Sequence, residues 1–131
     1  MADAGAGSTQ PAPRSAAADA ETLKQHGSAR LAADDLLGAL YKYSQALQLL
    51  AGDASAATDA SSVPLRTALH ANVALVNLKL QRYGDALDAA NAALALQPTH
   101  ECVLCRRATA RAKLVTCAPH CVLQRLHSYG Q

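Results

Sequence analysis

At 131 residues, the chain has room for one modest domain at most. It contains no Phe or Trp and many Ala, a composition that favours closely packed helices and argues against a sheet. The formal net charge of +2 is too small to indicate nucleic-acid binding, and no apolar run approaches the roughly 18 residues of a membrane span. The N-terminus lacks the pattern of a secretory signal, so the four Cys predict reduced thiols and a cytoplasmic location.

The N-terminal half of the chain predicts two helices after an unstructured start. Residues 1–19 are rich in Ala, Gly, Pro and Ser and are expected to form a disordered arm. Helices are predicted over about 21–33 and 36–50, and Asp34 and Asp35 can cap the second one. Gly38 lies early in that helix, where it is costly unless a close helix crossing requires it.

The C-terminal half predicts three more helices. The small and polar residues 51–62 are expected to form a flexible connector, and Pro64 suits the first turn of a helix that ends near Leu80. After a tight turn at 81–84, a fourth helix is expected over about 85–96. Pro98 separates it from a fifth helix over about 100–115, and Pro119 is expected to stop that helix. The remaining residues, 116–131, are then an irregular tail.

Two parts of the chain repeat each other at an offset of 47 residues. The segment 39–49 recurs as 86–96, and the same offset places Gly27 opposite Ala74. A repeat of this length, with apolar residues at helical spacing, indicates stacked helix pairs rather than one globular core. Such pairs form a groove, so the sequence favours a protein-binding module. No catalytic triad, carboxylate pair or Gly-rich phosphate loop stands out, and neither an enzyme nor a cofactor is expected.

The helix pairs resemble the tetratricopeptide repeat, a helix–turn–helix about 34 residues long. That family has small residues at its eighth, twentieth and twenty-seventh positions and Pro at its thirty-second. Counted from Thr67, one repeat supplies all four, as Ala74, Ala86, Ala93 and Pro98. Counted from Ala20, another supplies Gly27, Ala39 and Ala46, with Tyr43 at the bulky twenty-fourth position, but no Pro. Counted from Glu101, a third has Ala108 but His120 where Ala is expected.

The resemblance implies an all-α fold of two helix pairs plus one further helix, a fragment of an α-solenoid. The repeat domain would span residues 20–115, with repeat 1 at about 20–50 and the connector at 51–62. Repeat 2 would span about 64–98 and half of a third repeat about 100–115.

Within that family, the chain is most similar to the domains of co-chaperones such as large immunophilins and myosin chaperones. The residues that carry this similarity are Leu23-Lys24-x-x-Gly27, the segment 72–83, and Arg106-Arg107-x-x-Ala110. Those domains hold the acidic C-terminus of heat-shock chaperones in a carboxylate clamp of five positions.

Three of the five clamp positions match the family. Lys24, Asn72 and Arg106 stand where the family has them, whereas Ser28 replaces Asn and Cys102 replaces Lys. The resemblance therefore implies a weakened peptide-binding site formed by Lys24, Ser28, Asn72 and Arg106, to which Lys79 adds positive potential.

Two alternatives stay open. In the first alternative, the chain is a structural scaffold or a truncated repeat fragment. It then binds a partner helix or loop without recognising a carboxylate. A zinc or thiol module would instead use Cys/His residues near the C-terminus, namely Cys102, Cys105, Cys117, His120 and Cys121. The first two lie inside a predicted helix, so no metal is expected. The last helix lacks a partner, so we also expect self-association or a capping protein.

Overall fold

The computed structural model describes residues 15–54 and 58–129, with side chains as far as Thr116. In chain order the elements are α2 (Ala16–Ala32), α3 (Leu36–Gly52), the 3₁₀ helix η1 (Ala60–Ser62), α5 (Val63–Lys79), α6 (Tyr83–Leu96) and α7 (Glu101–Tyr129). The part of the chain so described contains helices and no strand, which confirms the all-α class. None of its helices is long and apolar enough to cross a membrane.

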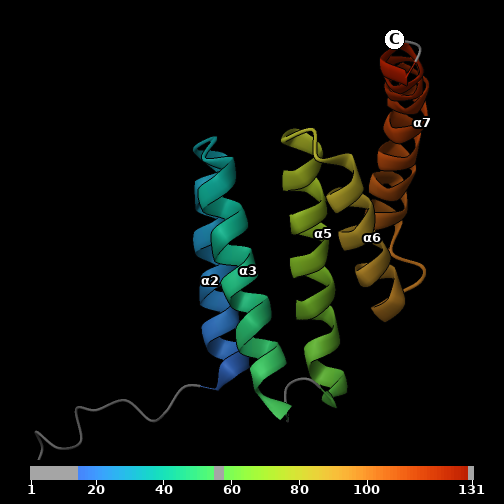
Figure 1. The fold of residues 1–131 in the computed structure, drawn as a ribbon. Helices are drawn as coiled ribbons and strands as arrows, with labels where there is room; N and C mark the ends of the chain where they lie inside the picture. Colours follow the sequence, from blue (N-terminus) through green and yellow to red (C-terminus); the bar gives the residue numbers. More distant parts are fainter. Residues whose placement is uncertain (1–14, 55–57, 130–131) are drawn as a thin grey trace, which may run out of the picture.

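The helices pack as pairs that stand side by side in chain order (Figure 1). α2 packs mainly against α3, and α5 mainly against α6. Contacts between α3 and α5 join the two pairs, and α7 closes the row by packing on α6 and α5. Each pair is joined by a short turn, so its two helices run in opposite directions.

The turns inside the two pairs have the same backbone geometry at the predicted offset of 47 residues. Asp34 has a φ of 64°, and Gln81, its equivalent, has a φ of 62°. In both turns the next N–H donates to the carbonyl oxygen five residues earlier, over 2.8 Å. A left-handed residue with this hydrogen bond is the Schellman motif, a common way to end a helix. The repeat in the sequence therefore corresponds to a repeat in local structure.

Asp35 caps α3, as the sequence predicts. Gly38 N–H donates to its Oδ1 at 3.0 Å, and Arg30 Nη1 donates to its Oδ2 at 2.8 Å. These two bonds, the first above all, lower the pKa of the Asp35 carboxyl. A Cβ at Gly38 would collide with Asp35 Oδ2 and would lie 2.9 Å from Arg30 Cδ on α2, so the glycine makes room for the capping carboxylate and for the arginine that pairs with it.

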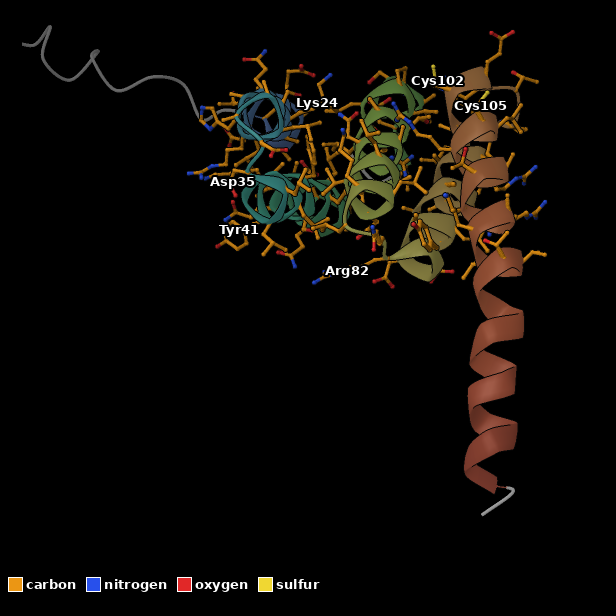
Figure 2. The ribbon with its side chains drawn as sticks, turned by 90° about the horizontal axis from the view of Figure 1, so that it is seen from above. Lys24, Asp35, Tyr41, Arg82, Cys102 and Cys105 are labelled. Carbon is orange, nitrogen blue, oxygen red and sulfur yellow. The ribbon has the colours of Figure 1, made fainter. Side chains whose placement is uncertain are left out.

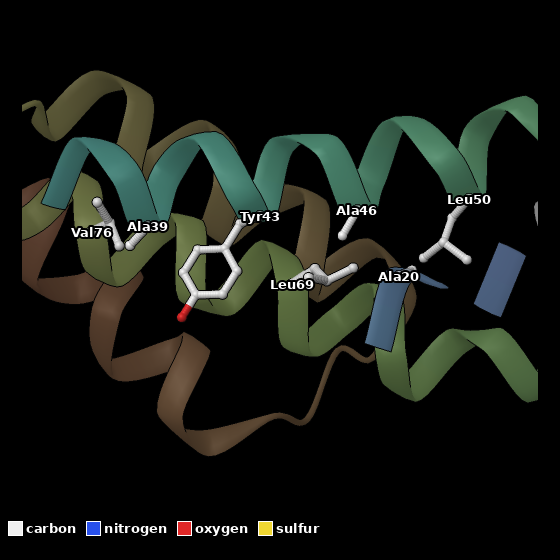
Figure 3. Close-up of a cluster of buried hydrophobic side chains, with 7 residues drawn as sticks. All are labelled: Ala20, Ala39, Tyr43, Ala46, Leu50, Leu69 and Val76. Carbon is white, nitrogen blue, oxygen red and sulfur yellow. The ribbon is translucent and has the colours of Figure 1, made fainter. Parts of the chain in front are cut away.

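The first pair packs around Tyr43, which points from α3 into a cluster of buried side chains and is fully buried itself (Figure 3). The cluster consists of Ala20, Ala39, Tyr43, Ala46, Leu50, Leu69 and Val76. Gly27 on α2 makes room for the ring, because a Cβ there would lie 2.6 Å from Tyr43 Cε1. At the offset of 47 residues, Gly27 and Tyr43 correspond to Ala74 and Ala90, both fully buried in the second pair. At these two positions, the first pair has glycine facing tyrosine, whereas the second pair has two alanines.

The start of α2 corrects the sequence prediction. α2 begins at Ala16, because Ser15 Oγ accepts a hydrogen bond from Ala18 N–H at 3.1 Å and the following alanines are strong helix formers. Ala20 is fully buried. The expected disordered arm is therefore wrong for residues 15–19, while residues 1–14 lie outside the described part of the chain.

The segment between the pairs is shorter than the predicted connector 51–62. α3 continues to Gly52, η1 occupies Ala60–Ser62, and residues 55–57 of the connector lie outside the described residues. Similarly, α6 begins at Tyr83, inside the stretch that was expected to turn.

The irregular tail expected over 116–131 is wrong as far as Tyr129, because α7 continues through Pro119. Proline removes one helical hydrogen bond and crowds the preceding turn, at a cost of about 3 kcal/mol, but its φ near −65° is itself helical. The cost weakens the helix there without forcing it to end. The C-terminal part of α7 projects well past α5 and α6 (Figure 2).

Candidate peptide-binding site

The predicted clamp residues come from three neighbouring helices. Lys24 lies on α2, Asn72 on α5 and Arg106 on α7. α5 contacts both α2 and α7, so these helices form one row. Figure 2 shows Lys24, Cys102 and Cys105 on the side of the molecule where this row lies, and Tyr41 and Arg82 on the opposite side.

Arg106 is joined directly to α5. Its Nη1 donates to the backbone oxygen of Ala71 over 2.7 Å, which ties α7 to the middle of α5. The Ala71 carbonyl belongs to the peptide group that leads into Asn72, so Arg106 reaches the α5 backbone next to that residue. A guanidinium has five N–H donors, and this bond uses only one of them. Asn72 is half-buried, and no hydrogen bond of its side chain is described in the structure.

Lys24 is partly occupied by a neighbour on its own helix. Its Nζ lies 3.2 Å from Glu21 Oε1, one turn earlier on α2, and 26% of its side chain is exposed. Such an ion pair within one helix stabilises by only about 0.3–0.5 kcal/mol. A ligand carboxylate can therefore replace Glu21 at little cost.

Ser28 has a structural partner that sequence reasoning missed. Its Oγ lies 3.1 Å from the hydroxyl of Tyr43, and either oxygen can be the donor. A buried tyrosine hydroxyl needs a hydrogen-bond partner, and Ser28 supplies it from the edge of the site. When Tyr43 donates, the Ser28 hydrogen is free for a ligand. The signal in the sequence was the pairing of Gly27 with bulky Tyr43, which places the residue after Gly27 beside the tyrosine.

Lys79 and the thiols of Cys102 and Cys105 are exposed to solvent. Lys79 is exposed at the end of α5, two turns beyond Asn72. Cys102 and Cys105 are exposed free thiols on α7. Within the part of the chain that carries side chains, no three His, Cys, Asp or Glu residues are arranged to hold a metal. Cys117, His120 and Cys121 lie beyond Thr116, so most of the zinc alternative falls on side chains outside the described part.

A second group of polar residues was not predicted. Arg66 and His70 on α5 line a hollow of about 330 Å³, whose other described lining residues are Leu47, Leu50 and Ala51 of α3. Their spacing of four residues places both side chains on one face of a helix. The sequence alone does not show which surface that face meets.

No protein-family model matches the chain, and no curated protein matches it either.

Proposed function

We propose that the chain is a non-catalytic protein-binding module of the tetratricopeptide-repeat type, a co-chaperone-like adaptor in the cytoplasm. It binds the acidic C-terminal peptide of a heat-shock chaperone through a partial carboxylate clamp. The observation that carries this proposal is the bond from Arg106 Nη1 to the Ala71 oxygen, 2.7 Å long, which holds the guanidinium against the backbone of α5 one residue before Asn72. Lys24, on the same row of helices, supplies a second cation.

This set of groups suits a terminal carboxylate. A guanidinium and an amide offer several convergent N–H donors, and charge-assisted hydrogen bonds are about twice as strong as neutral ones. Ser28 and Cys102 reduce the strength of the site, because a lost charge-assisted bond costs about 1.5–3 kcal/mol, or roughly 10–100-fold in affinity. We therefore expect weaker binding than in a clamp with all five family residues.

The test is titration calorimetry with a peptide that ends in Met-Glu-Glu-Val-Asp and with the same peptide amidated at its C-terminus. We expect binding of the free acid only. Arg106→Ala is expected to weaken that binding by about 10–100-fold. Arg107→Ala is the matched control, since it removes the same charge from the next residue of α7 and is expected to change affinity by less than about two-fold. Melting curves followed by circular dichroism show whether Arg106→Ala keeps α7 in place.

Equal binding of the free and amidated peptides would favour the alternative function, a scaffold that binds a partner helix or loop. A specific observation supports this alternative. α7 has an apolar stripe of exposed residues on the side away from the rest of the fold, formed by Leu104, Ala108, Ala112 and Val115. Of these, Val115 is 68% exposed. A partner helix or a second copy of the chain that packed there would bury this stripe.

A further inference from the structure

The hollow between α3 and α5 has two chemically different walls. The wall from α3 is aliphatic, formed by Leu47, Leu50 and Ala51. The wall from α5 carries the guanidinium of Arg66 and the imidazole of His70, one helical turn apart. The volume is about 330 Å³, within the usual range of small-molecule sites.

The hollow is separate from the proposed peptide clamp. Asn72 follows His70 by two residues on α5, and residues two apart on a helix point to nearly opposite sides. A ligand in the hollow therefore does not touch the face that carries Asn72.

The α5 wall has a positive charge that the described residues do not neutralise. Arg66 Nε donates to Ser62 Oγ over 3.3 Å, and the structure describes no ion pair for Arg66. The two terminal nitrogens of the guanidinium therefore have no protein partner among the described residues. Among the described residues that line the hollow, Arg66 and His70 are the titratable ones.

The imidazole is neutral at neutral pH in the absence of a ligand. Burial of His70, and then the nearby charge of Arg66, lowers the pKa of His70 below its ordinary value. A negative charge between the two side chains would act against this lowering of the pKa. It would pair with the guanidinium and favour the protonated imidazole.

We propose that this hollow binds a small aliphatic carboxylate, with its apolar chain against Leu47, Leu50 and Ala51 and its carboxylate between Arg66 and His70. The volume of about 330 Å³ lies at the small end of small-molecule sites, which calls for small probes. Octanoate and N-acetyl-leucine both combine a short aliphatic chain with one carboxylate. The first represents a free fatty acid, and the second represents the C-terminal residue of a peptide.

The experiment is a titration of the full chain by NMR, with octanoate, N-acetyl-leucine and octanol as probes. We expect saturable binding of at least one carboxylate at the hollow, and binding of octanol that is at least ten-fold weaker. The carboxylate that binds more tightly identifies the source of the natural ligand. Arg66→Gln is expected to weaken carboxylate binding by about 10–100-fold. Arg66→Lys, which keeps the charge, is expected to restore most of the lost affinity.

Two controls separate the site from general effects. Arg111→Gln removes one positive charge from the exposed side of α7 and is expected to leave carboxylate binding within two-fold of the unchanged chain. Binding is also expected to strengthen as the pH falls from 7.5 to 6, because the bound carboxylate raises the pKa of His70 and the complex takes up a proton. His70→Gln should abolish this pH dependence, whereas Arg66→Gln should not.

The proposal is overturned if neither carboxylate saturates the hollow, if octanol binds as tightly as octanoate, or if Arg111→Gln and Arg66→Gln weaken binding equally. None of these results bears on the peptide clamp, because Asn72 and Lys79 lie on another face of α5 and the other clamp residues lie on α2 and α7.

Discussion

Replacing Gly27 by Ala tests the close contact between α2 and α3. A Cβ at this position would lie 2.6 Å from Tyr43 Cε1 and 2.9 Å from Cδ1, closer than carbon atoms approach in folded proteins. The ring of Tyr43 is fully buried and is held by a hydrogen bond to Ser28, so it has little room to move. The helices must therefore separate or the ring must leave its position.

The size of the effect follows from two opposing contributions. Adding a methyl group to a well-packed core costs about 1–3 kcal/mol, while Ala in place of Gly stabilises a helix interior by about 0.5–1 kcal/mol. We expect Gly27→Ala to lower the free energy of unfolding by about 1–2 kcal/mol, which corresponds to a fall in Tm of roughly 4–8 °C in a domain of this size. Urea unfolding followed by circular dichroism at 222 nm measures the change.

Gly84→Ala is the matched control. The same substitution meets no atom within 4 Å at this position in α6. We expect it to leave stability unchanged or to raise it by up to about 0.5 kcal/mol. In a Tyr43→Leu background, where the outer ring atoms are absent, Gly27→Ala should no longer destabilise. A Gly27→Ala variant as stable as the unchanged chain would refute the argument, and so would an equal loss in the Tyr43→Leu background.

Three further predictions concern the turns, the pH dependence and the last helix. Gln81→Gly should stabilise the fold by about 0.5–1 kcal/mol in urea unfolding, because glycine adopts a left-handed conformation freely. Asp34→Gly should gain less, because Asp tolerates that conformation better than Gln. Since burial lowers the pKa of His70, the folded state binds fewer protons than the unfolded state just below the ordinary value of 6.5. Stability should therefore be full above that pH and fall as the pH drops below 6.5. In His70→Gln this fall should be smaller, and equal slopes would contradict the prediction. Finally, the chain should self-associate at high concentration through α7, and Leu104→Glu or Val115→Glu should shift it towards monomer in sedimentation velocity. An unchanged distribution in both variants would contradict this prediction.

The paired helices could be predicted because their signal is local and occurs twice. Small residues at helical spacing recur at a fixed offset, and the two turns differ little in backbone geometry. The cap at Asp35 could be predicted for the same reason, since a capping carboxylate acts within one helical turn. Lys24, Asn72 and Arg106 were placed on three neighbouring helices by their repeat positions alone. The direct bond from Arg106 to the Ala71 carbonyl needed the structure, because it depends on how closely α7 approaches α5.

The predictions for the start of α2 and the end of α7 were wrong because helix propensity was underestimated in the first case and the effect of proline was overestimated in the second. Ser15 and the alanines after it form a capped helix, although their composition is also typical of a disordered arm. Pro119 was treated as a stop, yet α7 passes through it. The hollow beside Arg66 and His70 could not have been predicted, because it forms where the end of α3 meets α5 across the connector. No pattern of residue spacing in the sequence indicates this contact between α3 and α5.

The bond from Arg106 to Ala71 couples the packing of α7 to the binding of a ligand. It is the described side-chain hydrogen bond that joins α7 to α5, and it starts from a residue of the proposed peptide site. Suppose that a ligand binds only when Arg106 is bonded to α5. By thermodynamic linkage, the ligand then stabilises the packing of α7 on α5 by the same free energy by which that packing strengthens ligand binding. Hydrogen exchange in the first turns of α7 should therefore slow when a peptide binds. A partner that contacts the projecting C-terminal part of α7 would then meet a more firmly held helix when the peptide site is occupied.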